Sequence, residues 1–371
     1  MLNVLYLINH AGKAGTERYV QTLIEKLNNK KINAFFAYNE DGLLRERLEK
    51  SGIKMLQIRM RHPFDIGAAW KLSRFCRENK IDLIHTHFLR ENYIALLSRL
   101  FNPKTRVIYT NHFIMANPVM LRFFNRILSP LQGRIIAVCS PGKEMLIKNG
   151  NRKSIIDVVY NSVEPDYWKT NEASTLRQEF GIGNDEFVLL CASRFAHDKG
   201  HSYLVKTIAA LKDMTSVKFR CVLAGDGPLL EETKQLVEAL NLQKEILFIG
   251  FRQDMKNLYQ GSNLYFNASA HEALSFLIIE ALASGLPVAA TDMGGNNNII
   301  NEQTDCGVLV KYDDPFSTAQ AISEIMENRS LYEKYRANAF KAVEEFFNLE
   351  KNVTKTCEIF ENVCKRPDQA I

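Results

Sequence analysis

The chain has 371 residues, of which 46% are hydrophobic and 24% charged, and these are ordinary values for a globular protein. At about 150 residues per domain, this length predicts two domains or slightly more. The composition excludes a disordered chain and a collagen-like repeat. The seven cysteines are scattered and form no CxxC pair, which excludes a small disulfide scaffold and a zinc knuckle.

Charge is divided unevenly along the chain. Residues 1–170 contain 27 Lys and Arg against 14 Asp and Glu, a net charge of +13, whereas residues 171–371 carry a net charge of −8. A basic half is typical of proteins that meet nucleic acid or an acidic membrane face, although solvated surface charge gives the same count. No helix-turn-helix, zinc finger or interleaved basic and aromatic pattern occurs in the sequence, so we expect no nucleic acid partner.

Residues 117–131 predict an amphipathic helix, because apolar residues recur there at helical spacing: Met120, Phe123, Phe124, Ile127 and Leu128. Arg122 and Arg126 lie among them. A basic amphipathic helix with aromatic side chains can lie in a membrane interface. The pattern fits equally well a helix that packs on the core and leaves two arginines in solvent.

Short apolar runs alternate in chain order with longer amphipathic stretches. The runs that predict strands are residues 4–9, 34–38, 54–57, 83–86, 107–111, 135–139 and 156–159, then 187–193, 219–224, 246–249, 264–267, 288–291 and 307–310. The stretches that predict helices include residues 16–29, 67–79 and 91–100, then 202–211, 229–240 and 278–284. Val, Ile and Leu runs separated by helices are typical of parallel sheets covered on both faces. The sequence therefore predicts an α/β protein of two doubly wound, Rossmann-like domains with a linker near residues 161–169.

The strongest local motif spans residues 269–287 and contains two carboxylates eight residues apart, Glu272 before a helix and Glu280 inside it. Glu280 interrupts an apolar run, and a buried carboxylate must be hydrogen-bonded or paired. A pair of ligand hydroxyls would satisfy it, whereas a surface-facing helical Glu is the simpler alternative. The amides at the start of this helix, from Ala273 to Phe276, suit a phosphate.

Two further motifs follow strands of the second half. Arg194 and Lys199 come directly after a strand, where a forked cation and a compact one can bind phosphate oxygens, although a solvated loop is equally consistent. Residues 224–228 form a Gly-rich strand-to-helix turn around Gly225, which is weak evidence alone. The chain has no Asp-x-Asp pair for holding a diphosphate through a divalent metal. We therefore expect no metal and no other cofactor, because Arg194, Lys199 and a helix terminus can neutralise a diphosphate.

In the first half, a glycine-containing loop of residues 12–17 connects the first strand to the first helix, where backbone can approach a ligand closely. It lacks the GK[ST] ending of a P-loop. His85 and His87 share one face of a strand, but no carboxylate lies at ligand spacing, so we expect no metal site there. His112 follows another strand in a polar turn and is the better functional candidate.

Together these motifs resemble the retaining glycosyltransferases of the GT-B fold, family 4, and the likeness covers nearly the whole chain. Residues 272–288, with Glu272 and Glu280, are similar to the family's E-x7-E signature and its trailing EAxAxGxPV. Residues 193–200 are similar to its GRL…KG segment and residues 225–228 to its GxGP segment.

The likeness extends to the first half and has departures. Residues 160–164 are similar to the family's YNGVD segment, residues 15–18 to its GGxER loop, and residues 110–112 to its TxH segment. Several positions differ from the usual residue: Ser193, Ser162 and Ala273 stand where glycine is frequent, and Asn298 stands where Glu is frequent.

The resemblance implies roles for the matching residues. Glu280 would bind the ribose hydroxyls of the donor, and Glu272 would hold sugar hydroxyls near the reacting carbon. Arg194 and Lys199 would stabilise the leaving diphosphate, and His112 would lie near the donor sugar or the acceptor. The remaining donor-binding positions are Gly15, Leu274, Ser275, Phe276, Gly225 and Arg252.

The resemblance thus implies a metal-independent hexosyltransferase that retains anomeric configuration. Its donor is a nucleotide sugar, with UDP favoured over GDP, and its acceptor a lipid-linked or cell-surface glycan intermediate of polysaccharide or cell-envelope biosynthesis. Residues 1–165, with a last helix of about 350–371 crossing back, would bind the acceptor, and residues 166–349 the donor, across a cleft. We expect a cytoplasmic protein, peripheral on the inner face of the cell membrane, because no signal peptide or apolar run of about 18 residues is evident.

Two alternatives stay open at this point. One is a non-catalytic GT-B protein that binds a nucleotide sugar, and the other is a nucleotide-sugar epimerase. A phosphorylase of this fold would need a lysine-bound pyridoxal site and usually a much longer chain.

Overall fold

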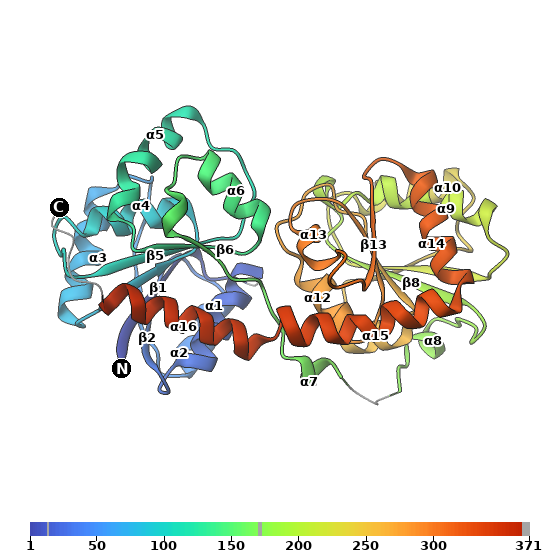
Figure 1. Ribbon diagram of the computed structural model, residues 1–371, viewed down its shortest axis with the longest axis horizontal. Helices are drawn as coiled ribbons and strands as arrows, with labels where there is room; N and C mark the ends of the chain where they lie inside the picture. The colour runs from blue at the N-terminus through green and yellow to red at the C-terminus, as the bar shows by residue number, and fades with distance from the viewer. Residues whose placement is uncertain (13–14, 170–172, 366–371) are drawn as a thin grey trace. The chain divides into compact units, whose positions relative to one another are not determined.

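The computed structural model describes residues 1–12, 15–169 and 173–365, and it divides into two compact units (Figure 1). Unit 1 consists of residues 1–161 together with the C-terminal segment that starts at Glu350, and unit 2 consists of Ser162–Leu349. Each unit is a parallel sheet with helices on both faces, which confirms the predicted α/β class with two doubly wound domains.

Unit 1 contains a seven-stranded parallel sheet in the order β3-β2-β1-β4-β5-β6-β7. The strands are β1 (Leu2–His10), β2 (Ile32–Glu40), β3 (Lys54–Gln57), β4 (Leu83–Thr86), β5 (Arg106–Asn111), β6 (Arg134–Ala137) and β7 (Ile156–Val158). The helices are α1 (Gly15–Leu27), α2 (Leu43–Lys50), α3 (Ile66–Glu78), α4 (Leu89–Ser98), α5 (Val119–Leu128), α6 (Ser140–Lys148) and α16 (Leu349–Lys365). The order reverses between β1 and β4, where Leu7 pairs with Thr86.

Alternate side chains of β1 point to opposite faces of this sheet, as the period of two requires. Leu5 and Leu7 pack in one cluster with residues of α3 and α4. On the other face Tyr6 lies beside His85, and the ring of Phe360 from α16 lies 5.1 Å from the ring of His85. Helix α16 also donates hydrogen bonds to two carbonyls near β7, from Asn352 (3.2 Å) and Lys355 (2.8 Å).

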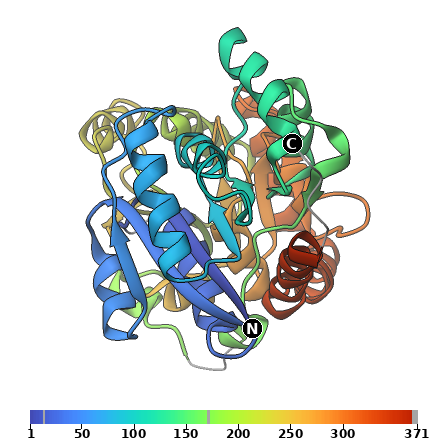
Figure 2. The same cartoon turned by 90° about the vertical axis from the view of Figure 1, so that its left-hand side faces the viewer.

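The apolar side chains of helix α5 are divided between the core of unit 1 and solvent. Leu121, Phe124 and Leu128 pack against the α3–α4 cluster, while other apolar side chains of the same helix face solvent. The interpretation of residues 117–131 as a core-packing helix therefore holds for one face of α5, and the opposite apolar side chains are exposed. Figures 1 and 2 both show α5 at an outer end of unit 1.

Unit 2 contains a six-stranded parallel sheet in the order β10-β9-β8-β11-β12-β13. The strands are β8 (Phe187–Ala192), β9 (Phe219–Ala224), β10 (Ile246–Gly250), β11 (Leu264–Asn267), β12 (Val288–Thr291) and β13 (Gly307–Val310). The helices are α7 (Pro165–Trp168), α8 (Leu176–Glu179), α9 (His201–Met214), α10 (Leu230–Ala239), α11 (Met255–Gly261), α12 (Phe276–Ala283), α13 (Asn296–Ile299), α14 (Pro315–Glu327) and α15 (Arg329–Phe346). The strand order reverses between β8 and β11, where Leu189 pairs with Leu264.

All seven cysteines are free thiols, and six of them are buried. Within the part of the chain that the structure describes, no helix combines the length and the apolarity needed to cross a lipid bilayer.

Candidate active site

The two motifs with the most chemistry follow the two strands at which the sheet of unit 2 reverses its order. Residues 193–200 follow β8, and residues 268–275 follow β11. Such a reversal leaves a crevice at the carboxyl ends of the strands, and ligands of open α/β sheets bind there. The topology therefore brings Lys199 and Glu272 to one edge, although they lie 73 residues apart in sequence.

Lys199 and Glu272 form an ion pair at this edge. The Nζ of Lys199 lies 3.0 Å from Oε2 of Glu272, and the Oγ of Ser269 donates to the same oxygen over 3.4 Å. The two charged side chains are 22% and 17% exposed, so the pair is mostly covered by protein but still accessible to a ligand. A carboxylate with one face toward a lysine and another toward solvent can accept hydrogen bonds from sugar hydroxyls.

The backbone fixes this pair by joining the two loops. The carbonyl of Asp198 accepts hydrogen bonds from the amides of Ala270 (2.9 Å) and His271 (3.2 Å). Gly200 has φ +67°, and a Cβ there would lie 2.0 Å from the carbonyl oxygen of Ala268. Glycine is therefore required where Lys199 passes into α9, because any side chain would push the two loops apart.

Arg194 is the outer cation of the site. Its side chain is 69% exposed and lies 3.7 Å from Asp198, so the guanidinium is accessible to an anion. The neighbouring segment is anchored by His201, whose ring stacks on Phe195 at 4.0 Å and whose Nε2 lies 3.1 Å from Oγ of Ser193. Burial lowers the pKa of His201 to about 4, so this ring is neutral at pH 7. Ser193 thus makes a hydrogen bond to His201 that a glycine at this position could not make.

The Gly-rich turn packs directly on the Arg194 segment. Gly225 has φ +148°, and a Cβ there would lie 2.0 Å from the carbonyl oxygen of Ser193. The amide of Phe195 donates to the carbonyl of Asp226 over 2.9 Å. Gly225 therefore lies at the same edge as Arg194. Glycine is needed at this position because a side chain would clash with the carbonyl oxygen of Ser193.

Glu280 is buried, with 1% of its surface exposed, so the surface-facing alternative for this residue is wrong. The hydroxyl of Tyr259, in α11, lies 3.2 Å from Oε2 of Glu280 and 3.1 Å from the carbonyl oxygen of Leu277. Tyr259 was not identified from the sequence, because nothing in its local pattern links it to a carboxylate 21 residues later.

Helix α12 begins two residues before the predicted helix of residues 278–284, and three residues after Ala273. Phe276 is its first residue, and Ser275 is the N-cap whose hydroxyl accepts from the amide of Ile278 over 3.4 Å. Leu274 is buried in the preceding loop, and the carbonyl of Ala273 accepts a hydrogen bond from the loop before α13. Of the residues proposed to present amides to a phosphate, only Phe276 belongs to the helix itself.

The structure does not bring Arg252 into contact with the Lys199–Glu272 pair. Arg252 follows β10, the edge strand, and its guanidinium pairs with Glu179 (3.0 Å) and Asp254 (2.6 Å). Hydrogen bonds from Arg252 hold the pKa of Asp254 below its usual range. The charge of Arg252 is thus already matched by two carboxylates, which makes a structural role the simplest explanation of its position.

In unit 1 the corresponding reversal lies between β1 and β4, and the predicted residues of this unit cluster near it. Gly15 is the exposed first residue of α1, while residues 13 and 14 of the same loop lie outside the described residues. His112 follows β5, and its Nε2 lies 3.2 Å from Nδ1 of His87. The ring of Tyr19, one turn into α1, lies 5.0 Å from the ring of His112.

The rings of Tyr19 and His87 lie beside His112, and the side chain of Asn111 hydrogen-bonds within the turn that follows β5. Burial lowers the pKa of His112 and of His85 to about 3, and that of His87 well below its usual value. His85 is held by Thr110 through a 2.7 Å hydrogen bond. At pH 7 these rings are therefore neutral and act as hydrogen-bond donors or acceptors, not as cations.

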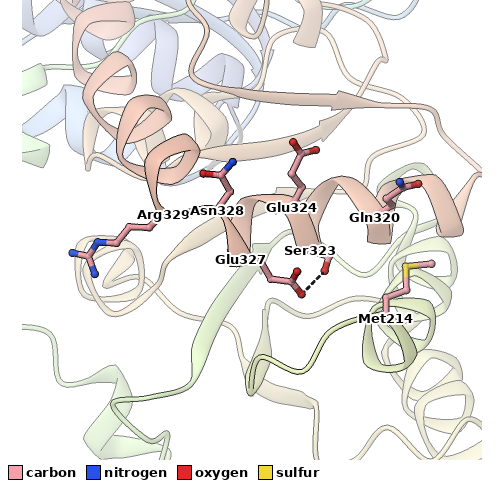
Figure 3. A pocket seen from close by; sticks show the side chains of 7 residues that line it. All are labelled: Met214, Gln320, Ser323, Glu324, Glu327, Asn328 and Arg329. Atoms are coloured by element: carbon pink, nitrogen blue, oxygen red, sulfur yellow. Dashed lines mark hydrogen bonds between the residues drawn. The ribbon is translucent and has the colours of Figure 1, made fainter.

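A separate hollow of unit 2 lies away from these motifs (Figure 3). Met214 ends α9 just before β9 begins, which puts this hollow at the amino ends of the strands. The hollow is lined by Met214, Gln320, Ser323, Glu324, Glu327, Asn328 and Arg329. Within the described residues, no group of three or more His, Cys, Asp or Glu is placed to hold a metal ion.

Comparison with known proteins defines the class. The family model described as Glycosyltransferase Family 4 matches residues 14–167, and the model described as Glycosyl transferases group 1 matches residues 172–342. The chain belongs to family 4 of the glycosyltransferases with the GT-B fold, and it is a glycosyltransferase.

Individual relatives are distant but span most of the chain. N-acetyl-alpha-D-glucosaminyl L-malate synthase of Bacillus anthracis is 24% identical over 313 residues, which cover 82% of this chain and 80% of that protein. UDP-Gal:alpha-D-GlcNAc-diphosphoundecaprenol alpha-1,3-galactosyltransferase of Escherichia coli is 22% identical over 308 residues, 80% of this chain and 79% of that one. The structure of Anabaena HepE in complex with UDP shares the fold, with a TM-score of 0.85, 21% identity and coverage of 97% and 100% of the two chains.

Proposed function

We propose that this glycosyltransferase transfers a hexose from a UDP-sugar to an acceptor carried on a lipid, with retention of anomeric configuration and without a metal ion. The observation that carries the proposal is the 3.0 Å pair of Lys199 and Glu272 at the strand reversal of unit 2, with the buried carboxylate of Glu280 eight residues further along. The names of family relatives that specify UDP-Gal and diphosphoundecaprenol support this choice of donor and acceptor.

Unit 2 holds the donor in this proposal. Glu280 accepts hydrogen bonds from the two ribose hydroxyls, the role that the E-x7-E resemblance implies, and a carboxylate can accept several hydrogen bonds at once. The diphosphate lies between the start of α12 and the two cations, where Phe276 offers a backbone amide and Lys199 and Arg194 offer positive charge.

Charge stabilisation is the main chemical contribution of this site. As the bond between the sugar C1 and the diphosphate oxygen breaks, negative charge grows on the diphosphate, and Lys199 and Arg194 offset it. The acceptor oxygen forms its bond to C1 on the same face, and its proton passes to the departing diphosphate oxygen. Glu272 is already paired with Lys199, so its carboxylate is suited to holding sugar hydroxyls and is a poor nucleophile.

Unit 1 holds the acceptor in this proposal. His112, neutral at pH 7, hydrogen-bonds an acceptor or sugar hydroxyl, and the contact with His87 orients its ring. Gly15 lets the first loop approach the donor phosphates, which is a role for backbone and not for a side chain.

Product analysis tests this function. The protein is incubated with single UDP-sugars and a bacterial lipid extract, and lipids are examined by mass spectrometry for the added mass of one hexose. The anomeric proton coupling of the purified product, measured by NMR, then reports whether configuration is retained. A product of inverted configuration, or transfer that is abolished by a metal chelator, would contradict the proposal.

A further inference from the structure

Helix α5 and the loop before it carry an exposed apolar surface. Six large hydrophobic side chains form it: Phe113, Met115, Val119, Met120, Phe123 and Ile127, whose exposures range from 52% to 80%. Sixteen large hydrophobics are exposed among the described residues, so more than a third of them fall within fifteen consecutive positions. We call these six residues the α5 patch. Single exposed apolar residues are normal, whereas a concentrated set marks an interaction surface.

The α5 patch differs from the core-facing side of the same helix. At about 100° per residue, Val119, Met120, Phe123 and Ile127 occupy an arc of about 100° on the helix surface. Leu121, Phe124 and Leu128 lie on the adjoining arc and pack on the core of unit 1. Packing on the core therefore accounts for one apolar arc, and the other arc is exposed. Both views of the chain show α5 at an outer end of unit 1 (Figures 1 and 2).

Hydrogen bonds to Asn149 hold the loop before α5 in place. Asn149, at the end of α6, accepts from the amide of Asn117 (2.9 Å) and donates to the carbonyl of Met115 (2.9 Å). The side chain of Asn125 donates to the carbonyl of Asn149 over 2.8 Å. These bonds fasten α5 and its preceding loop to α6, so the patch is presented on a fixed support.

The chain segment that carries the patch is strongly basic. Residues 113–153 contain seven Lys and Arg and one acidic residue, Glu144, a net charge of +6. Arg122 and Arg126 lie on α5 beside the exposed apolar arc, and both are exposed. Lys148 and Arg152, both exposed, lie one residue before and three residues after Asn149, which hydrogen-bonds to α5 and its preceding loop. An apolar arc bordered by cations complements a bilayer whose headgroups are anionic.

We propose that the α5 patch is a docking surface for an anionic lipid bilayer, with the apolar arc inserted among the lipids and the neighbouring arginines and lysines on the headgroups. This proposal rests on the proposed function for the statement that the acceptor is carried on a lipid. It deepens that function by assigning the surface of the protein that meets the membrane. Its test measures binding to lipid and not transfer, so the two can fail separately.

Co-sedimentation with vesicles tests the docking. One set of vesicles consists of equal parts phosphatidylcholine and phosphatidylglycerol, and the other of phosphatidylcholine alone. The first variant, Phe123→Ser with Ile127→Ser, removes apolar surface, and the second, Arg122→Glu with Arg126→Glu, reverses charge. The matched controls lie on exposed positions of unit 2: Phe316→Ser for the first, and Arg329→Glu with Lys341→Glu for the second.

The proposal predicts that the wild-type protein sediments with the anionic vesicles and not with the neutral ones. Each α5 variant lowers the partition coefficient by about tenfold or more, since two apolar or two charged contacts are lost, and the controls leave it unchanged. Raising the salt to about 1 M, where the Debye length is about 3 Å, also releases the protein.

Three results would overturn the proposal: no binding of the wild-type protein to anionic vesicles, equal binding by the α5 variants, or a wild-type dimer that the α5 variants convert to monomers without a change in vesicle binding. The last result would assign the patch to a second copy of the chain. Thermal melting and titration with UDP accompany each variant, and because the altered side chains are exposed we expect both to be unchanged.

Discussion

Replacement of Glu280 by alanine tests the donor site through one buried group. The carboxylate is 1% exposed, and in the proposal it accepts hydrogen bonds from both ribose hydroxyls of the donor. Hydrogen bonds to a charged acceptor contribute about 1.5 kcal/mol each, so the loss of two costs about 3 kcal/mol. That corresponds to a Kd for UDP about 100-fold higher. Glu280→Gln retains an acceptor oxygen and should weaken binding by about tenfold.

The structure also indicates that these variants will fold. The hydroxyl of Tyr259 lies 3.1 Å from the carbonyl oxygen of Leu277 as well as 3.2 Å from Glu280, so it has an acceptor when the carboxylate is removed. Isothermal titration calorimetry with UDP gives the Kd of each variant. Glu324→Ala, on the exposed face of α14, is the matched control and should bind as the wild type does.

A second ligand separates the ribose contact from a general loss of affinity. UDP that lacks both ribose hydroxyls should bind the wild type about 100-fold more weakly than UDP does, and it should bind Glu280→Ala almost as UDP does. If the folded alanine variant bound UDP with an unchanged Kd, or if it still discriminated between the two ligands, Glu280 would not be the ribose acceptor.

Three other predictions address charge, backbone and pH. Lys199→Ala should lower the rate of UDP release by about 100-fold to 1,000-fold, as expected when one stabilising group of a transition state is lost, while Lys341→Ala should leave initial rates unchanged. Gly200→Ala should destabilise the fold by more than about 2 kcal/mol, because φ is +67° and a Cβ would meet a carbonyl oxygen at 2.0 Å. Gly181→Ala, with φ +63° and open space around the new Cβ, should cost only about 1 kcal/mol, and equal shifts in Tm for the two would refute the clash. Burial holds the pKa of His85 at about 3 against about 6.5 when unfolded, so between these values the unfolded chain binds the extra proton and stability falls as pH falls. In urea denaturation from pH 6 to pH 4, His85→Gln should reduce that slope by about 1.4 kcal/mol per pH unit, and an unchanged slope would contradict the assignment.

The strands could be predicted from the sequence because buried parallel strands are short apolar runs bounded by helices. Each of the thirteen strands of the structure overlaps a predicted run, with ends displaced by at most two residues. The run at 135–139 extends past the end of β6 because Val138 and Cys139 stay buried after the ladder hydrogen bonds stop.

The residues of the candidate site could be predicted from the sequence where they directly follow a predicted strand. Lys199 and Glu272 each follow a predicted strand, but only the structure gives the strand order that brings the two residues together. Arg252 also follows a strand, but only the structure shows Glu179 and Asp254 around its guanidinium. Contacts between distant elements, such as Tyr259 with Glu280, leave no periodic signal in the sequence and could not be predicted from it.

The exposure of the α5 patch could likewise not be predicted from the sequence. Helical spacing shows that apolar residues share faces, but Phe123 and Phe124 are neighbours in sequence with opposite surroundings. Which arc meets the core depends on how α5 packs against α3 and α4, and that packing is a tertiary property.

A turnover panel tests the central claim most directly. The purified protein is given UDP-glucose, UDP-galactose, UDP-N-acetylglucosamine, GDP-mannose and ADP-glucose in turn, with and without a bacterial lipid extract, and release of the nucleoside diphosphate is followed beside Glu280→Ala. The account predicts release of UDP from one donor, raised by the lipid extract and lost in the variant. Release that is equal in Glu280→Ala, or conversion of a donor to its epimer without any acceptor, would contradict it.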